Sequence, residues 1–239
     1  MGIHPKETNV NESRTGFLAV FLVMSLSSAI FALGGGWVKT GESKGVTGYA
    51  RPAPQSILHE MMAVGMVEAP VTDIEALLRD IPAQKDYLYL CSDAELINFP
   101  GKTNTVDSYC IYSKMNMPAP VLDRDSIILW DWTTERSTGA RFVHGEGIRT
   151  NYRLEKNVVR MMFITLDFTL TPKGPDKTEV TYSVLMNPVG TLPESVKGML
   201  TKNLAMKTLL GIRERVRRNR EQLARPDLGK PFSGKEQQP

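Results

Sequence analysis

Few side chains in this sequence could do acid–base chemistry. The three histidines, His4, His59 and His144, lie far apart in the sequence. Neighbouring residues of a strand point to opposite faces, so His59 and Glu60 make a poor acid–base pair. His144 and Glu146 would share a strand face, but solvent-exposed positions explain that spacing more simply than catalysis does. The sequence contains no GxSxG motif, no HExxH motif and no phosphate-binding loop, so we predict no catalytic residue.

The two cysteines, Cys91 and Cys110, do not form a CxxC pair. The sequence therefore indicates no zinc site, and we predict neither a metal nor a cofactor. A disulfide bond between them would be allowed in an oxidising compartment. The expected hairpin register places Cys110 opposite about Ala94 rather than Cys91, so the bond is not implied.

The composition is that of an ordinary globular protein, with 239 residues, 41% of them hydrophobic and 23% charged. This length is enough for one domain with a sizeable core, or at most for two. The net charge of +3 is too small to indicate a nucleic-acid partner.

The N-terminal region contains an apolar segment without charges at residues 17–33, after a polar stretch at residues 1–16. The segment has the minimum length for crossing a bilayer, and small residues at its end offer cleavage positions. We expect an export signal, with an uncleaved membrane anchor or a buried core helix as alternatives. The protein would then be periplasmic or secreted, or tethered by residues 17–33. We divide the chain into residues 1–36, a folded domain at 37–223, and a disordered tail at 224–239 that is rich in Pro, Gly, Lys and Gln.

Alternating apolar and polar residues predict a series of strands in the folded domain, with one short helix at 74–79. The expected strands lie near residues 37–51, 57–67, 94–99, 106–115, 126–134, 141–148, 157–171 and 178–186. Residues 172–175 are expected to form the turn between the last two strands. Many consecutive strands between helices indicate an α+β domain with a curved antiparallel sheet.

A long amphipathic helix is predicted after this sheet. Pro193 and Glu194 suit its first turn, and no proline follows until beyond Leu223, which gives a helix about 45 Å long at 1.5 Å per residue. Its expected apolar face contains Val196, Met199, Leu200, Asn203, Met206 and Leu210. This face could complete a solid core, or the sheet could curl around the helix and leave a cavity. The pattern alone favours the solid core, although the 12 methionines suit an adaptable apolar pocket.

Short segments along the domain match a known family in their order and spacing. They are Gly45–Arg51, Met66–Pro70, Pro120–Asp125, and Thr178–Tyr182 continuing through Pro188–Gly190 to Leu192–Pro193. From about Trp37 to Arg218 the chain resembles the START domains, the lipid-binding branch of the Bet v 1-like (SRPBCC) helix-grip superfamily, and in particular a bacterial, exported member. The resemblance implies a curved antiparallel sheet wrapped around the C-terminal helix, with an internal hydrophobic cavity that holds one lipid-like molecule.

The resemblance also implies roles for particular residues. Arg124 and Asp125 match an Arg-Asp pair of the family that looks structural. Sterol-carrying members place an acidic and a basic group in the tunnel, and the corresponding positions here are roughly Ile111 and Trp130, which points to a more apolar tunnel. Counting along the strands puts Ser113 on the same inner side. The predicted cavity lining is Tyr109, Ile111, Met115, Ile128, Trp130, Trp132, Leu166, Phe168, Tyr182, Val184, Met186, Met199, Asn203, Met206 and Leu210.

Binding and transfer of a lipid or other hydrophobic small molecule, without covalent chemistry, is the function that the resemblance favours. The alternative is a cyclase or aromatase of the same superfamily acting on a polyketide-like substrate, which would need polar groups inside the cavity. The predicted lining offers only Tyr109, Ser113, Tyr182 and Asn203 for that role. We expect a monomer without a nucleic-acid partner.

An arginine cluster near the end of the long helix could touch anionic lipid headgroups during exchange, at about 1 kcal/mol per basic residue. The cluster consists of Arg213, Arg215, Arg217, Arg218 and Arg220. A solvated helix end, whose cations complement the negative helix terminus, is the simpler interpretation. Glu214 and Glu221 dilute the positive charge.

Overall fold

The computed structural model describes residues 36–161 and 163–224. The predicted export or anchor segment at 17–33 and residues 225–239 of the predicted tail at 224–239 lie outside the described residues, while Ala224 ends α3. Within the described ranges, no helix is both long and apolar enough to cross a bilayer.

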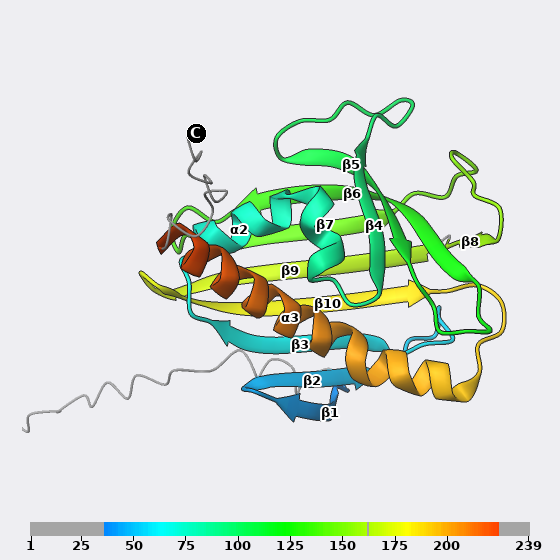
Figure 1. Cartoon of the computed structure of the whole chain (residues 1–239), viewed down its shortest axis with the longest axis horizontal. Helices are drawn as coiled ribbons and strands as arrows, with labels where there is room; N and C mark the ends of the chain where they lie inside the picture. The colour runs from blue at the N-terminus through cyan, green and yellow to red at the C-terminus, as the bar shows by residue number, and fades with distance from the viewer. Residues whose placement is uncertain (1–35, 162, 225–239) are drawn as a thin grey trace, which may run out of the picture.

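A single sheet of ten strands forms one layer of the structure (Figure 1). The spatial order is β1-β2-β3-β10-β9-β7-β6-β5-β4, and β8 pairs in parallel with the start of β6. Every other pairing is antiparallel. The strands are β1 Val38–Ser43, β2 Val46–Arg51, β3 Glu60–Val67, β4 Cys91–Ile97, β5 Ser108–Met115, β6 Asp123–Thr134, β7 Arg141–Gly147, β8 Val158–Arg160, β9 Phe163–Gly174 and β10 Lys177–Asn187. The predicted curved antiparallel sheet is confirmed, and it is not closed into a barrel.

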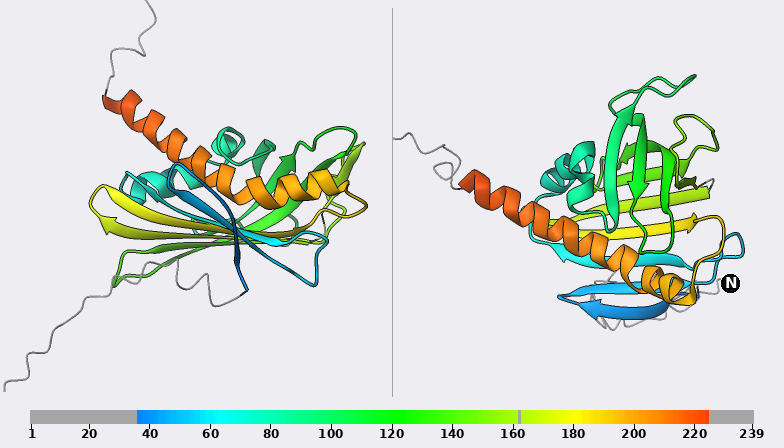
Figure 2. Two further views of the ribbon diagram at one scale, coloured as in Figure 1. Left: turned by 90° about the horizontal axis from the view of Figure 1, so that it is seen from below. Right: turned by 45° about the vertical axis from the view of Figure 1, so that its right-hand side comes forward.

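The helices cover one face of this sheet. They are α2 (Val71–Arg79), the 3₁₀ helix η1 (Ile81–Asp86) and α3 (Glu194–Ala224). α3 crosses the sheet diagonally and contacts β2, β3 and β10, while α2 and η1 lie beside it on the same side (Figures 1 and 2). The sheet curves beneath α3, which is the predicted helix-grip arrangement.

The alternation of β9 and β10 explains which face is covered. Ile164, Leu166, Phe168 and Leu170 on β9, with Val180, Tyr182, Val184 and Met186 on β10, are all at most 6% exposed. Asp167, which lies between them, is on the outer face and receives a 2.7 Å hydrogen bond or ion pair from His144 Nδ1. His144 and Glu146 are both exposed there, as their predicted surface position requires.

The prediction of one continuous strand at 157–171 is wrong, because the structure has two strands there, β8 and β9. The division follows from a buried ion pair: Arg160 donates to both carboxylate oxygens of Asp125 at 2.8 and 3.0 Å, which holds β8 against β6. β9 also continues to Gly174, so the predicted turn at 172–175 is displaced toward Pro175 and Asp176.

The predicted register of the β4–β5 hairpin is also wrong. Ala94 pairs with Ser113, Cys110 pairs with Ile97, and Cys91 pairs with Met115. The connection between the strands is longer than predicted, because Asn104 is bound to both sides of it: its side chain donates to the Ile97 carbonyl and accepts from the Cys110 amide. Both cysteines are free thiols.

The buried stripe of α3 differs in part from the predicted face. Val196 and Leu200 are buried as expected, and the stripe continues at intervals of four residues through Leu204, Thr208, Ile212 and Val216. Met199, Asn203 and Leu210 are only partly buried. A helix that packs through its i±4 ridge presents a line of this spacing, which drifts around the helix away from the predicted face.

Gly211 marks a close crossing between α3 and the segment after η1. A Cβ atom at this position would overlap the Tyr87 carbonyl oxygen and lie 3.1 Å from the Tyr87 Cα. Backbone atoms cannot move aside as the end of a flexible side chain can. Gly198, on the same helix, has no atom within 4 Å of an added Cβ.

We therefore expect opposite effects from the same substitution at these two glycines. Gly198→Ala should raise the free energy of unfolding by about 0.5–1 kcal/mol, because alanine has the higher helix propensity. Gly211→Ala should lower it by about 1–3 kcal/mol, because the methyl group overpacks the crossing. Urea unfolding of both variants measures this, and equal stabilisation of the two would contradict the described crossing.

Candidate ligand-binding cavity

A mostly apolar cavity lies between the inner face of the sheet, the η1–β4 segment and α3. The centre of a water molecule can occupy a volume of about 50 Å³ inside it. One buried water needs roughly 10–15 Å³ on that measure, so the cavity has room for a few waters. A lipid-sized ligand therefore requires the surrounding side chains or segments to move apart.

Eight of the fifteen predicted lining residues are brought together around this cavity. They are Ile111, Met115, Ile128, Trp130, Leu166, Tyr182, Val184 and Met186. Ser113, which was expected on the same inner side, also lines it. These residues come from four neighbouring or nearby strands, and their shared orientation follows from the alternation along each strand. Their contact with a ligand remains a prediction.

The other seven predicted residues lie elsewhere. Phe168 packs behind the lining, stacked on Tyr182 with ring centroids 4.4 Å apart. Met206 lies against β2, where it is the neighbour of Gly48. The partly buried residues of α3, namely Met199, Asn203 and Leu210, are not among the side chains that line the cavity.

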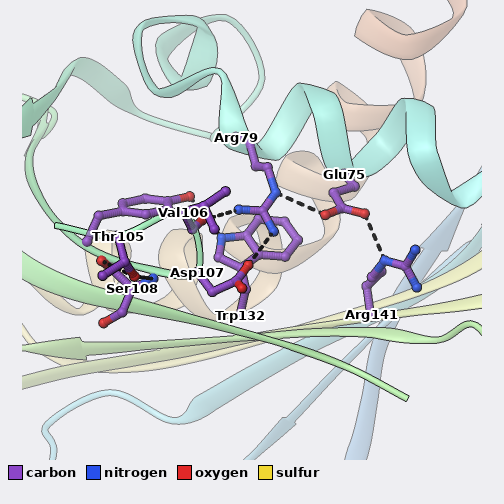
Figure 3. Close-up of polar contacts among 9 residues, drawn as sticks. Glu75, Arg79, Thr105, Val106, Asp107, Ser108, Trp132 and Arg141 are labelled. Carbon is purple, nitrogen blue, oxygen red and sulfur yellow. Dashed lines mark hydrogen bonds and ion pairs between the residues drawn. The ribbon is translucent and has the colours of Figure 1, made fainter. Parts of the chain in front are cut away.

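Tyr109 and Trp132 lie beneath α2, outside the cavity lining. Trp132 Nε1 donates to the Tyr109 hydroxyl at 2.9 Å. The guanidinium of Arg79 stacks 4.0 Å above the Trp132 ring (Figure 3). Arg79 also donates to the Val106 carbonyl at 2.6 Å.

Glu75 joins α2 to the sheet at the same place. Its two carboxylate oxygens accept from Arg79 at 3.0 Å and from Arg141 at 2.8 Å (Figure 3). Arg79 bonds in addition to Asp107 at 3.2 Å. These contacts hold α2 against the inner face of the sheet.

Several lining residues were missed by the sequence-based prediction. The η1–β4 segment contributes Gln84, Leu88, Tyr89 and Cys91, α3 contributes Leu204 and Thr208, and β5 and β9 contribute Lys114 and Ile164. The η1–β4 segment has no apolar periodicity that would reveal an inner face. Thr208 could have been found from the spacing of four that starts at Val196 and Leu200.

Two titratable groups of the cavity lining, those of Cys91 and Tyr182, are neutral near pH 7. Burial raises the pKa of the Cys91 thiol to about 11, and it also raises the pKa of the Tyr182 hydroxyl above its ordinary value. Lys114, which lines the cavity, is bound to Glu155 at 2.9 Å. Among residues 36–161 and 163–224, no three His, Cys, Asp or Glu side chains are gathered as a metal site would need.

The Arg-Asp pair lies outside the cavity lining, and both members are buried. Arg124 donates to three backbone carbonyls: those of Leu122, of Pro188 at 2.9 Å and of Val189 at 3.0 Å. It therefore connects the start of β6 to the loop that leads into α3. Asp125 is held by Arg160.

The arginine cluster of α3 is extensively paired. Arg217 binds Glu214 and Glu221, Arg218 binds Glu214, and Arg215 lies 3.5 Å from Asp86. Arg220 binds Asp176 at 2.8 Å and the Glu68 carbonyl, and Arg213 donates to the carbonyls of Lys44 and Met66. These contacts reduce the positive charge available to a membrane surface.

Comparison with known proteins agrees with this architecture. No family model matches the chain. Over 194 residues it is 29% identical to an uncharacterized protein of Pseudomonas aeruginosa, a match that covers 79% of this chain and 93% of that protein. The crystal structure of a STAR-related lipid transfer protein fragment from Xanthomonas axonopodis is 25% identical, with a TM-score of 0.67 over 76% of this chain and 99% of that one. Human StAR-related lipid transfer protein 5 is 16% identical, with a TM-score of 0.68 over 80% and 94%. The chain has a START-like helix-grip fold, as its resemblance predicted.

Cys91 offers a chemical measurement of the cavity environment. Alkylation requires the thiolate, and a thiol with a pKa of about 11 has much less thiolate at pH 7.5 than a free cysteine does. We expect iodoacetamide to label Cys91 about a hundredfold more slowly than free cysteine at pH 7.5, with the rate rising as the pH increases from 9 to 11. Mass spectrometry of the labelled chain measures this.

Cys91→Ala is the control for this measurement. Cys110 is fully buried, so this variant should remain unlabelled on the same timescale. Labelling of the wild type at the rate of free cysteine would contradict the raised pKa of the partly buried Cys91 thiol.

Proposed function

We propose that this chain binds a lipid or other hydrophobic small molecule in the cavity and transfers it, without covalent chemistry. The observation that carries the proposal is the apolar lining of the cavity, in which Ile111, Ile128, Leu166, Val184 and Met186 converge from the sheet. The solved proteins of the same fold reported above are named as lipid transfer proteins, which supports the same function here.

Burial of apolar surface would supply the binding free energy, at roughly 25 cal/mol per Å² removed from water. Among the described lining residues, burial keeps Cys91 and Tyr182 protonated near neutral pH, and Lys114 is paired with Glu155, so these groups do not form an acid–base pair. This neutrality supports binding over a cyclase-type reaction.

The loop between β10 and α3 is the segment that we propose moves to admit the ligand. Val189 in this loop has φ of 55°, a strained conformation for a β-branched residue, and its side chain is 40% exposed. Arg124 binds the carbonyls of Pro188 and Val189 and thereby holds the loop in place. Displacement of this loop or of the start of α3 would open a route to the cavity.

The location of this activity outside the cytoplasmic membrane is proposed from residues 17–33 alone. Contact with an anionic membrane during exchange would have to use whatever charge the paired arginine cluster leaves free. Neither the location outside the cytoplasmic membrane nor the contact with an anionic membrane depends on where the ligand binds.

Native mass spectrometry of the full-length chain tests the proposed function. We expect one hydrophobic molecule per chain, either co-purifying or taken up from a mixed lipid extract, which solvent extraction would then identify. An unliganded mass that persists after incubation with the extract would contradict the proposal.

A matched pair of serine substitutions tests whether the cavity is the binding site. Ser113→Leu adds apolar volume inside the cavity, while Ser183→Leu adds the same volume between Tyr182 and Val184 on the opposite face of β10. We expect the first variant to lose lipid uptake at least tenfold and the second to retain it. Equal uptake by both would place the ligand elsewhere.

A further inference from the structure

Two buried side chains around the cavity have polar atoms without a hydrogen-bond partner among the described residues. They are Gln84, at both Nε2 and Oε1, and Trp130, at Nε1. Both residues are 0% exposed, and both line the cavity. An unpaired buried polar group lowers stability, so a native structure retains one only where something compensates.

Elsewhere in the described structure, the Nε atoms of Arg213 and Arg215 also lack a partner, but other nitrogens of both guanidinium groups contact carbonyls or a carboxylate. Other buried polar side chains are paired. Thr178 donates to the Ala69 carbonyl at 2.9 Å, and Arg160 makes two bonds to Asp125. The indole of Trp132, which lies outside the cavity lining, donates to Tyr109. Within the described residues, Gln84 stands apart because both polar atoms of its side chain lack a partner.

Backbone hydrogen bonds hold the Gln84 main chain, and aromatic packing holds the Trp130 ring. The Gln84 carbonyl accepts from the Tyr87 and Leu88 amides at 3.2 and 2.8 Å, which fixes its backbone at the end of η1. The Trp130 ring lies between Tyr109 and Phe168, with centroid distances of 6.5 and 6.1 Å. Preorganised donors and acceptors of this kind bind a ligand group with little loss of conformational entropy.

We infer that Gln84 and Trp130 form a hydrogen-bonding subsite for a hydroxyl or amide group of the bound molecule, an inference that rests on the proposed function. Trp130 supplies a donor, and Gln84 supplies both a donor and an acceptor. A hydroxyl or amide also donates and accepts, so it can satisfy both residues. Thr208 lines the same space and already accepts from the Tyr89 amide at 3.1 Å, which leaves its hydroxyl proton to donate.

The subsite selects a neutral group over an ionised one. Lys114 is the charged residue of the lining, and it is already bound to Glu155. An ionised carboxylate or phosphate at Gln84 would be a buried charge without a counter-charge, which is strongly unfavourable. The ligand class is therefore a neutral lipid with a hydroxyl or amide.

A series of four ligands with the same chain length tests this selection: tetradecan-1-ol, tetradecanamide, tetradecanoate and tetradecane. We expect the full-length protein to bind the alcohol and the amide at least tenfold more tightly than the other two at pH 8, as measured by displacement of a fluorescent fatty probe. Gln84→Met, which keeps the length of the side chain, should remove that preference, because the alcohol and the amide then lose their hydrogen bonds at this position. Trp130→Phe should reduce the preference in the same direction.

Thermal unfolding without ligand separates a binding role from a structural one. Gln84→Met removes two unpaired polar atoms, so its midpoint should rise above that of the wild type. Thr178→Val, the control, removes a satisfied hydrogen bond away from the cavity, so its midpoint should fall while its ligand preference stays that of the wild type.

The outcomes distinguish this inference from the proposed function. Equal binding of the four ligands by the wild type, an unchanged preference in Gln84→Met, or a lower midpoint in that variant would overturn the subsite and leave hydrophobic binding intact. Failure of the wild type to bind any of the four ligands or any component of the lipid extract would overturn the proposed function itself.

Discussion

The fold depends on covering one apolar face of an open ten-stranded sheet. The strands twist and the sheet curves, whereas α3 is a single continuous helix, so the two surfaces cannot stay in contact along their whole length. α3 packs closely on β2 and β3 and approaches the Tyr87 backbone at Gly211. The η1–β4 segment lines the cavity through Gln84, Leu88, Tyr89 and Cys91. The cavity is the space that these contacts leave above β5, β6, β9 and β10.

The cavity differs from a solid core in its polar atoms as much as in its volume. A core that served stability alone would exclude the amide of Gln84 or provide it with a partner, because unsatisfied buried groups cost free energy without contributing to packing. The inner positions of β7 show how closely the rest of the interior is filled. An added Cβ at Gly145 or Gly147 would lie within 3 Å of Leu166 or Ile164, so those side chains occupy the space that the glycines leave.

The parts of the site that alternate regularly could be predicted from the sequence. On β9 and β10 the period of two assigned Leu166, Tyr182 and Val184 to one apolar face, and all three are buried. The positions of Ile111 on β5 and Trp130 on β6 came from the family resemblance instead. The η1–β4 segment follows no period, so nothing local indicates that Gln84 faces the interior. The prediction of the β4–β5 register failed because Asn104 bonds to both sides of the long connection between the two strands. The alternation of residues within a strand does not reveal such bonds.

The small volume of the cavity is compatible with a much larger ligand if opening costs less than burial gains. Burial contributes about 0.8 kcal/mol per CH₂ group, so an alkyl chain of about fourteen carbons gains roughly 11 kcal/mol. Displacing the loop at Val189 from β6 requires loss of the two Arg124 bonds to it, which costs a few kcal/mol at about 1.5–3 kcal/mol per hydrogen bond to a charged group. The small volume of the cavity without ligand is therefore no obstacle to binding, because an alkyl chain of sufficient length opens it with a net gain in free energy.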